Sequence, residues 1–342
     1  MNIAPSSLTV LPTYKCTAKC EQCCFGSSPR LTERLSLATI LERIEEAASS
    51  FTSLRHVTFS GGEAMLLKQD LLEAIKLCSS KRFSTRLVSN GFWASRPEKA
   101  DLRARALKEA GLTELNLSTG LDHSRFVAVS TVLTAAQRAC HSGIRTLITV
   151  EADTPESGIL KTVLADIRTT ELVNDGRLKV ICNSWVTFNS KITNRRRGVS
   201  ADTLRKGCSQ IFDSITITPF DQLATCCGLT MEHIPEMRIG KIEKGNLKQL
   251  YRSQLGDFLK IWLRVDGPYR IIERIMGPEA ADILTNVDHI CQACVLLHKN
   301  ASISQRLIRD HENFSEEVLG RFILHHEIAS AMEKGAVINE AS

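Results

Sequence analysis

The feature that most constrains the fold is a regular alternation of short apolar strands and amphipathic helices in the first half of the chain. Strands are expected at residues 8–14, 56–60, 85–89, 114–118, 145–150 and 178–182. Helices are expected between them, at residues 37–48, 69–78, 97–110, 130–142 and 158–169. Because the connections are short, this order predicts parallel strands with right-handed helical crossovers. Six such units make an open, partial barrel rather than a closed eight-fold one.

The second half of the chain has a different pattern. The alternation stops near residue 185, and a polar, basic segment follows at residues 189–198. Beyond it we expect a β-hairpin at 214–226, helices at 247–264, 269–276 and 280–285, and an amphipathic tail at 302–334. The predicted fold class is therefore α/β, with three parts. These are a partial (β/α)6 TIM-like barrel at 1–200, a small α+β domain at 201–300 and a helical tail at 301–342.

Composition narrows the class of function. The chain of 342 residues has twelve cysteines and no recognisable export signal, which favours metal or redox chemistry in the reducing cytoplasm over disulfides. No stretch is long and apolar enough for a membrane span, and nothing resembles a nucleic-acid-binding module. The net charge is +5, and the densest run of basic residues is the three arginines at 195–197. This run could contact an acidic partner or could be a solvated basic loop.

Three cysteines follow the first expected strand. Cys16, Cys20 and Cys23 have the spacing C-x3-C-x2-C. Three thiolates do not complete a four-coordinate zinc site by themselves, although a distant fourth ligand could do so. They can instead hold three irons of a [4Fe–4S] cluster and leave the fourth iron open to another ligand.

Polar and glycine-containing motifs end the next three strands. Gly61, Gly62 and Glu63 follow the second strand, Ser89 and Asn90 end the third, and Ser118 ends the fourth. The carboxyl ends of parallel strands lie at one edge of a sheet, where functional loops gather. We therefore expect these residues to lie beside the three cysteines.

Together these motifs resemble the radical S-adenosylmethionine (SAM) superfamily. The resemblance implies that Cys16, Cys20 and Cys23 hold a [4Fe–4S] cluster whose open iron binds the amino and carboxylate groups of SAM. It also implies SAM-binding roles for Gly61, Gly62, Glu63, Ser89, Asn90 and Ser118. Backbone carbonyls would approach the ligand at the glycines, and Glu63 would face the SAM ammonium. An external electron donor such as flavodoxin or ferredoxin is implied as a partner.

A second set of cysteines lies in the last part of the chain, at Cys208, Cys226, Cys291 and Cys294. Four thiolates could hold zinc or a second iron–sulfur cluster. Beside the first motif, the set resembles the Twitch domain, a shortened SPASM domain with a hairpin, a helix and one auxiliary [4Fe–4S] cluster. A full SPASM domain has seven cysteines for two clusters, more than this region offers. The implied cofactors are thus SAM and two [4Fe–4S] clusters.

The segments 23–29, 59–63 and 88–93 resemble the radical SAM epimerases of ribosomally made peptides. The likeness covers residues 8–297 and includes a short segment before Cys16, without room for an N-terminal peptide-recognition domain. In those enzymes a 5′-deoxyadenosyl radical removes a Cα hydrogen, and a cysteine thiol returns hydrogen from the opposite face to give a D-residue. Cys227 fits the donor, but it could also be a buried neighbour of Cys226 or replace it as ligand. Cys24 is a second candidate donor.

Other functions remain open. A peptide or small molecule could be oxidised or cross-linked, with the auxiliary cluster accepting an electron. Alternatively, the chain could be a non-catalytic metal-binding protein that binds a partner. Asp122, His123 and residues 183–186 lie on the expected substrate side, where they could orient a substrate or only cap the barrel. The sequence does not name the substrate.

Overall fold

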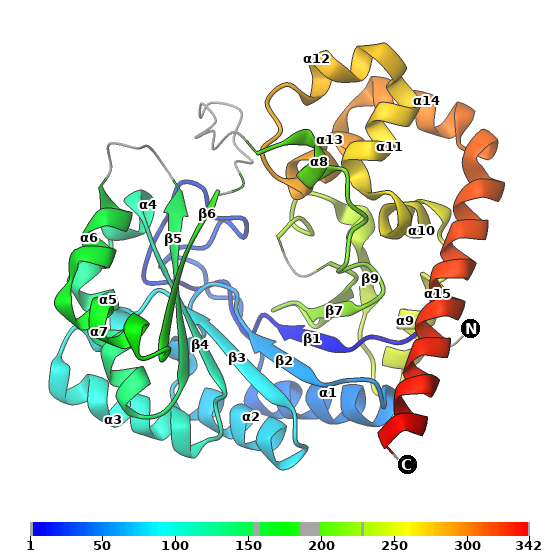
Figure 1. Ribbon diagram of the computed structural model, residues 1–342. Coiled ribbons are helices and arrows are strands. Elements are labelled where there is room, and N and C mark those ends of the chain that lie inside the picture. Colours follow the sequence, from blue (N-terminus) through cyan, green and yellow to red (C-terminus); the bar gives the residue numbers. More distant parts are fainter. Residues whose placement is uncertain (1–2, 153–157, 185, 187–198, 227–228, 341–342) are drawn as a thin grey trace.

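The computed structural model describes residues 3–152, 158–184, 186, 199–226 and 229–340. Its centre is a nine-stranded sheet in the order β6-β5-β4-β3-β2-β1-β7-β8-β9 (Figure 1). All neighbours from β6 to β7 pair in parallel, whereas β8 and β9 are antiparallel to their neighbours. The strands are β1 Ser7–Val10, β2 His56–Phe59, β3 Ser84–Ser89, β4 Glu114–Thr119, β5 Arg145–Ala152, β6 Leu178–Ser184, β7 Ser214–Ile217, β8 Gln222–Ala224 and β9 Arg238–Lys241.

The helices fall into two groups. Those of the first half cross over between parallel strands and cover the outer face of the curved sheet (Figure 1). They are α1 Leu37–Ser50, α2 Gln69–Ser80, α3 Pro97–Glu109, α4 Leu121–Ser124, α5 Val129–His141, α6 Ile159–Ala165 and α7 Ile167–Asn174. The second group is α8 Ala201–Leu204, α9 Leu247–Ser253, α10 Phe258–Val265, α11 Gly267–Met276, α12 Ala280–Leu284, α13 Ile290–Lys299, α14 Ala301–Asp310 and α15 Glu312–Glu340.

The predicted α/β fold is confirmed, with six parallel strands joined by helical crossovers. Two expected helices are each split in two. The helix expected at 247–264 forms α9 and α10, and Asp257, the N-cap of α10, accepts a hydrogen bond from the Lys260 amide at 3.2 Å. The helix expected at 158–169 forms α6 and α7. The break lies at Asp166, whose extended backbone ends α6 and whose side chain accepts a hydrogen bond from the Arg168 amide at 3.0 Å. Aspartate favours such an N-cap over a helix interior, so α7 starts afresh at this position.

The predicted hairpin forms, but it extends the barrel sheet, because β7 pairs in parallel with β1 over four residues. Arg43 of α1 fastens the turn of the hairpin, with its Nε and Nη2 each 2.9 Å from the Asp221 carboxylate. A further strand, β9, pairs with β8 at the edge of the sheet. It was not predicted because its sequence, Arg-Ile-Gly-Lys, has no alternation of apolar and polar residues. Because β7 pairs with β1, the hairpin between Cys208 and Cys226 belongs to the same sheet as the barrel strands. We call the segments around Cys208, Cys226, Cys291 and Cys294 the auxiliary-cysteine region.

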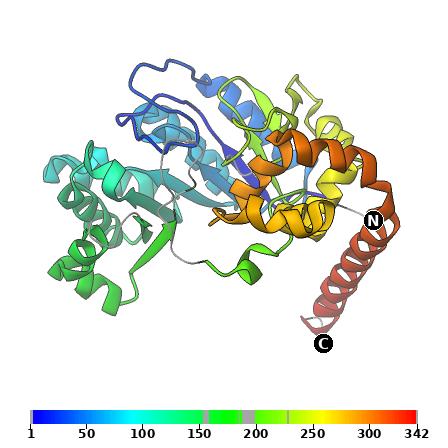
Figure 2. The ribbon, with the colours of Figure 1, turned by 90° about the horizontal axis from the view of Figure 1, so that it is seen from above.

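A second hydrophobic core lies beyond the sheet, among α10, α11, α13 and the hairpin region. The predicted helical tail is confirmed, and it contributes Ile303, Val318 and Phe322 to this core. Seen from above, the C-terminal part of α15 projects away from the rest of the molecule (Figure 2). No helix among the described residues is both long enough and apolar enough to cross a bilayer.

Asp266 joins three helices of the second core. Its fully buried carboxylate accepts hydrogen bonds from Trp262 Nε1 at 2.9 Å, Arg274 Nη1 at 2.7 Å and Arg321 Nη1 at 2.7 Å. Burial alone would raise the pKa of Asp266, but these three donors hold the pKa below its usual range. The charged carboxylate therefore stabilises the fold at neutral pH, and this contribution is lost as the pH falls through the lowered pKa.

Replacing Asp266 with Asn should lower the free energy of unfolding by about 3 kcal/mol, because two arginines lose their buried partner. Chemical denaturation at pH 7 measures the effect. Asp310→Asn is the matched control, since Asp310 pairs with Arg309 at the surface and should contribute little. Equal effects of the two substitutions would contradict a structural role for the buried network.

Candidate active site

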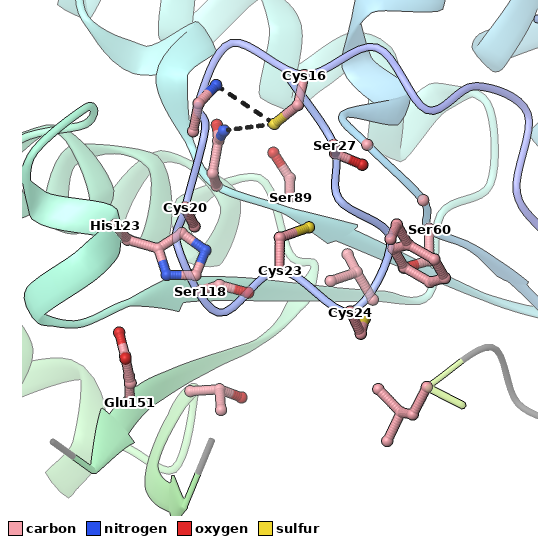
Figure 3. Close-up of a pocket in the computed structure, with 18 of the residues that line it drawn as sticks. Cys16, Cys20, Cys23, Cys24, Ser27, Ser60, Ser89, Ser118, His123 and Glu151 are labelled. Carbon is pink, nitrogen blue, oxygen red and sulfur yellow. Dashed lines mark hydrogen bonds between the residues drawn. The ribbon is translucent and has the colours of Figure 1, made fainter. Parts of the chain in front are cut away.

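A cavity of about 300 Å³ opens at the carboxyl ends of the parallel strands (Figure 3). Its walls come from the cysteine loop after β1, from the ends of β2 to β6, and from the auxiliary-cysteine region. Most residues singled out in the first half of the sequence line it: Cys16, Cys20, Cys23, Gly61, Gly62, Ser89, Asn90 and Ser118. The structure thus brings together motifs that are about a hundred residues apart in the chain.

The three cysteines of the loop lie close enough to influence one another electrostatically. Burial raises the pKa of Cys16 to about 11, and the nearby Glu63 and Cys23 add to the shift. Burial also raises the pKa of Cys20, with further contributions from Cys23 and Cys16. Iron would have to displace these thiol protons on binding. No three His, Cys, Asp or Glu side chains in the described ranges are placed to hold a single metal ion, whereas a [4Fe–4S] cluster binds each thiolate at a different iron.

Hydrogen-bond donors surround the Cys16 sulfur. The Ala18 amide lies 3.4 Å from Sγ, and Asn90 Nδ2 lies 3.7 Å from it (Figure 3). Asn90 Nδ2 also donates to Thr17 Oγ1 at 3.0 Å. Hydrogen bonds to ligand sulfurs tune the potential of iron–sulfur clusters, so this arrangement suits a thiolate ligand. In the described structure, the side-chain amide of Asn90 thus fixes the cysteine loop.

The two glycines after β2 are explained by their closeness to the same loop. A Cβ on Gly62 would lie 2.2 Å from the Lys15 carbonyl oxygen, and a Cβ on Gly61 would lie 2.6 Å from that of Thr13. The Gly62 amide donates to Thr13 O at 2.8 Å, and the next amide donates to Lys15 O at 2.9 Å. Missing side chains therefore let this segment pair with the backbone that carries the cysteines.

Glu63 is fully buried and is absent from the lining of the cavity. Its carboxylate accepts hydrogen bonds from the Asn90 amide at 2.9 Å, Ser89 Oγ at 3.1 Å and the Met65 amide at 3.1 Å. Burial raises the pKa of Glu63 to about 7, although the three donors oppose the shift. The carboxylate therefore joins the loops after β2 and β3.

Several further residues line the cavity, and Thr119, which ends the fourth expected strand, is also a candidate from the sequence. Ser27 Oγ and Thr119 Oγ1 are buried in the wall and have no hydrogen-bond partner among the described residues. Glu151, buried at the end of β5, accepts a hydrogen bond from the Asp122 amide at 3.2 Å. The strand was expected to end at residue 150, but β5 continues to Ala152. With the correct strand end, Glu151 would have been a candidate, because functional residues gather at the carboxyl ends of parallel strands. Buried hydroxyls without partners fit a cavity that holds a polar ligand such as SAM.

Asp122 and His123 lie in the short helix α4 rather than in an open loop. His123 lines the cavity, where burial lowers its pKa to about 4 despite the nearby Asp122. The imidazole is therefore neutral near pH 7. A neutral histidine can orient a bound molecule without adding charge to the site.

The structure also gathers the four cysteines of the second set. Cys208 precedes β7, Cys226 follows β8, and Cys291 and Cys294 lie on α13. Burial raises the pKa of Cys294, and the neighbouring Cys226, Cys291 and Cys208 raise it further. Cys227, the candidate hydrogen donor, lies outside the described residues.

Cys24 lies between the two cysteine sets. It lines the cavity beside Cys23. Burial raises the pKa of its thiol, and Cys23, Cys226 and Cys291 contribute to that shift. The second set is therefore close to the cavity that the first set lines.

Comparison with known proteins agrees with this arrangement. Residues 10–150 match the model of the radical SAM superfamily. The protein YydG of Bacillus subtilis (strain 168) is 30% identical over 118 residues, which are 34% of this chain and only 37% of YydG. The fold resembles native anSMEcpe with bound AdoMet and Cp18Cys peptide, with a TM-score of 0.56, 11% identity, and coverage of 93% of this chain and 99% of that chain. A histidine-tagged form of anSMEcpe with bound AdoMet gives a TM-score of 0.54 and 13% identity, over 76% of this chain and 84% of that chain.

The matched segment contains the cysteine loop, the two glycines and the ends of β2 to β4, which are among the elements that build the cavity. Radical SAM domains bind SAM and a [4Fe–4S] cluster. Residues 10–150 of the chain therefore form a radical SAM domain.

Proposed function

We propose that this protein is a radical SAM enzyme that converts L-residues of a ribosomally made peptide into D-residues. One observation carries the proposal: a single cavity is lined both by the radical SAM loop and by residues next to the auxiliary cysteines, Leu229 and His289. A substrate held there would meet the radical source and the C-terminal region at once. The relative YydG bears the name of a peptide biosynthesis protein, and anSMEcpe has been solved with a peptide bound, which supports a peptide substrate.

The proposed ligands of the first [4Fe–4S] cluster are Cys16, Cys20 and Cys23. When bound, this cluster and SAM supply a 5′-deoxyadenosyl radical that takes one hydrogen atom from the substrate. Gly61, Gly62 and Glu63 would hold the loops around the SAM amino group, mainly through the backbone. Ser89, Asn90 and Ser118 would complete the SAM site, together with the unpartnered hydroxyls of Ser27 and Thr119.

The second set, Cys208, Cys226, Cys291 and Cys294, would hold one auxiliary [4Fe–4S] cluster in a Twitch-like domain at residues 201–300. The barrel domain would cover 1–200 and the helical tail 301–342. In the proposed reaction, Cys227 gives its thiol hydrogen atom to the Cα radical from the face opposite to abstraction. The sulfur radical left on Cys227 then takes up one electron and one proton, with flavodoxin or ferredoxin as the electron source. Every described cysteine is free, which suits the reducing cytoplasm as the place of action.

The cysteine donor gives the sharpest test of epimerisation. Cys227→Ala should still form 5′-deoxyadenosine with the substrate peptide, because hydrogen abstraction does not need this thiol, but it should form no D-residue. Synthetic peptides encoded by short reading frames beside the gene serve as probes. Mass spectrometry of the peptide in deuterated water and chiral amino-acid analysis measure the products.

Cys24→Ala is the matched control, because Cys24 also lies beside a proposed ligand and lines the cavity. It should retain D-residue formation and deuterium uptake at Cα. D-residues formed at the normal rate by Cys227→Ala would exclude Cys227 as donor. Loss of D-residues in Cys24→Ala alone would assign the donor role to Cys24. A two-hydrogen mass loss or a cross-link in the wild type would instead indicate oxidation, with the auxiliary cluster as electron acceptor.

A further inference from the structure

His289 stands at the point where the auxiliary-cysteine helix meets the cavity. It is the N-cap residue of α13 and lines the cavity, whose barrel side carries the radical SAM cysteines. The residue is partly exposed, as expected of a side chain that faces a space able to hold a ligand. Neither the cysteine spacing nor the SAM motifs give this histidine a role.

The orientation and the tautomer of the ring follow from its hydrogen bond. His289 Nδ1 accepts a hydrogen bond from the Cys291 amide at 3.0 Å, so Nδ1 carries no proton. The neutral ring must then carry its proton on Nε2. A capping box holds the backbone as well, because Gln292 Oε1 accepts from the His289 amide at 3.0 Å. The ring is therefore held in one orientation, is neutral, and has Nε2–H as its hydrogen-bond donor.

Nε2 is the part of this ring that remains available. No described residue accepts a hydrogen bond from it. Leu229 and Val186 line the same cavity and have no side-chain hydrogen-bond donor. A peptide bound in the cavity must satisfy its backbone carbonyls with donors that line it, because an unpaired buried carbonyl is costly.

We propose that His289 is a substrate-positioning residue whose Nε2–H, presented from the N-terminus of α13, donates a hydrogen bond to a backbone carbonyl of the bound peptide. This inference rests on the proposed peptide substrate and adds the contact that holds it. Because the same ring also binds the Cys291 amide, the bond would set the distance of the peptide from the auxiliary-cysteine helix. The recognised chemistry is a main-chain carbonyl, which tolerates any side chain at that position.

A paired change in protein and peptide tests the contact. His289→Asn keeps an N-cap side chain that can accept from the Cys291 amide, but it removes the ring that reaches the cavity. The probe is the fluorescein-labelled form of the synthetic peptide that stimulates 5′-deoxyadenosine formation by the wild type. Binding is measured by anisotropy with SAM and without reductant, so no turnover is needed. We expect the dissociation constant to rise about 2- to 12-fold, the effect of one neutral hydrogen bond.

Peptides in which single amides are replaced by esters complete the test, because an ester carbonyl is a weaker acceptor. One ester position should weaken binding to the wild type by a similar factor but weaken binding to His289→Asn no further. His141→Asn, a substitution at the exposed end of α5, is the control and should bind as the wild type does. Iron content and the electron paramagnetic resonance spectrum of His289→Asn should match those of the wild type.

Three results would overturn the inference: unchanged peptide affinity in His289→Asn, no ester position whose effect depends on His289, or loss of iron in His289→Asn, which would indicate a purely structural cap. In the wild type alone, a series in which no ester position weakens binding would already contradict a main-chain carbonyl contact, even if the variant folds poorly. A wild type whose SAM cleavage responds to none of the peptides would overturn the proposed function and this inference together. That outcome is distinct from failure of the histidine contact alone.

Discussion

Replacing Cys20 with Ala is expected to lower the iron content from about eight to about four atoms per chain and to abolish 5′-deoxyadenosine formation from SAM. The reason is that two remaining thiolates of the loop do not hold a cluster with one open iron. The variant is purified and reconstituted without oxygen. Iron is then counted, and 5′-deoxyadenosine is measured by chromatography after reduction with dithionite.

Cys78→Ala is the matched control for this experiment. Cys78 is fully buried on the apolar face of α2, so its removal costs packing but no proposed ligand. It should keep about eight irons and normal SAM cleavage. Equal iron in the wild type and Cys20→Ala would contradict the assignment of Cys20. About four irons in the wild type would show that the protein holds only one cluster and has no auxiliary cluster.

The second large effect is expected from Gly62→Ala. The new Cβ would meet the Lys15 carbonyl oxygen at 2.2 Å, closer than any real contact, so one of the two backbones must move. We expect the free energy of unfolding to fall by about 2–3 kcal/mol. We also expect the displaced loop to lose the first cluster, because its cysteines follow Lys15 directly. Thermal unfolding of the protein before reconstitution, together with the iron count afterwards, measures both effects.

Gly320→Ala is the control for this change. Gly320 is exposed within α15, and nothing lies within 4 Å of the position of its Cβ. Alanine there should raise the free energy of unfolding by about 1 kcal/mol through helix propensity and leave the iron content unchanged. If Gly62→Ala behaved in the same way, the close pairing of the glycine segment with the cysteine loop would be wrong.

The elements that the sequence predicts well are those whose burial is periodic. β4 has alternating burial, and α1 buries Ile40, Ile44 and Ala47 at helical spacing, so each is evident from its local sequence. The pairing of β7 with β1 could not be predicted in this way. It joins Leu8 to Ile215, and no local pattern encodes which distant strand a buried strand will meet.

The candidate site shows the same limit. Strand ends located Ser89, Asn90 and Ser118 correctly beside the cysteines, because parallel strands share one edge. The functions of individual atoms did not follow from position. The sequence motifs predict SAM-binding roles for Glu63 and Asn90, but their contacts follow only from the structure, in which the Glu63 carboxylate is buried between loops and the Asn90 side-chain amide, which also lines the cavity, donates to Thr17. The role of His289 depends on a cap and a cavity that exist only in three dimensions.

The central claim is that one cavity couples SAM cleavage to hydrogen exchange at a peptide Cα. The most direct measurement is a reaction of the reconstituted wild type with the peptide in deuterated water, following 5′-deoxyadenosine, peptide mass and residue chirality together. We expect 5′-deoxyadenosine formation that depends on the peptide, one deuterium at Cα for each D-residue, and no other mass change. SAM cleavage that yields no D-residue and no deuterium at Cα would contradict it.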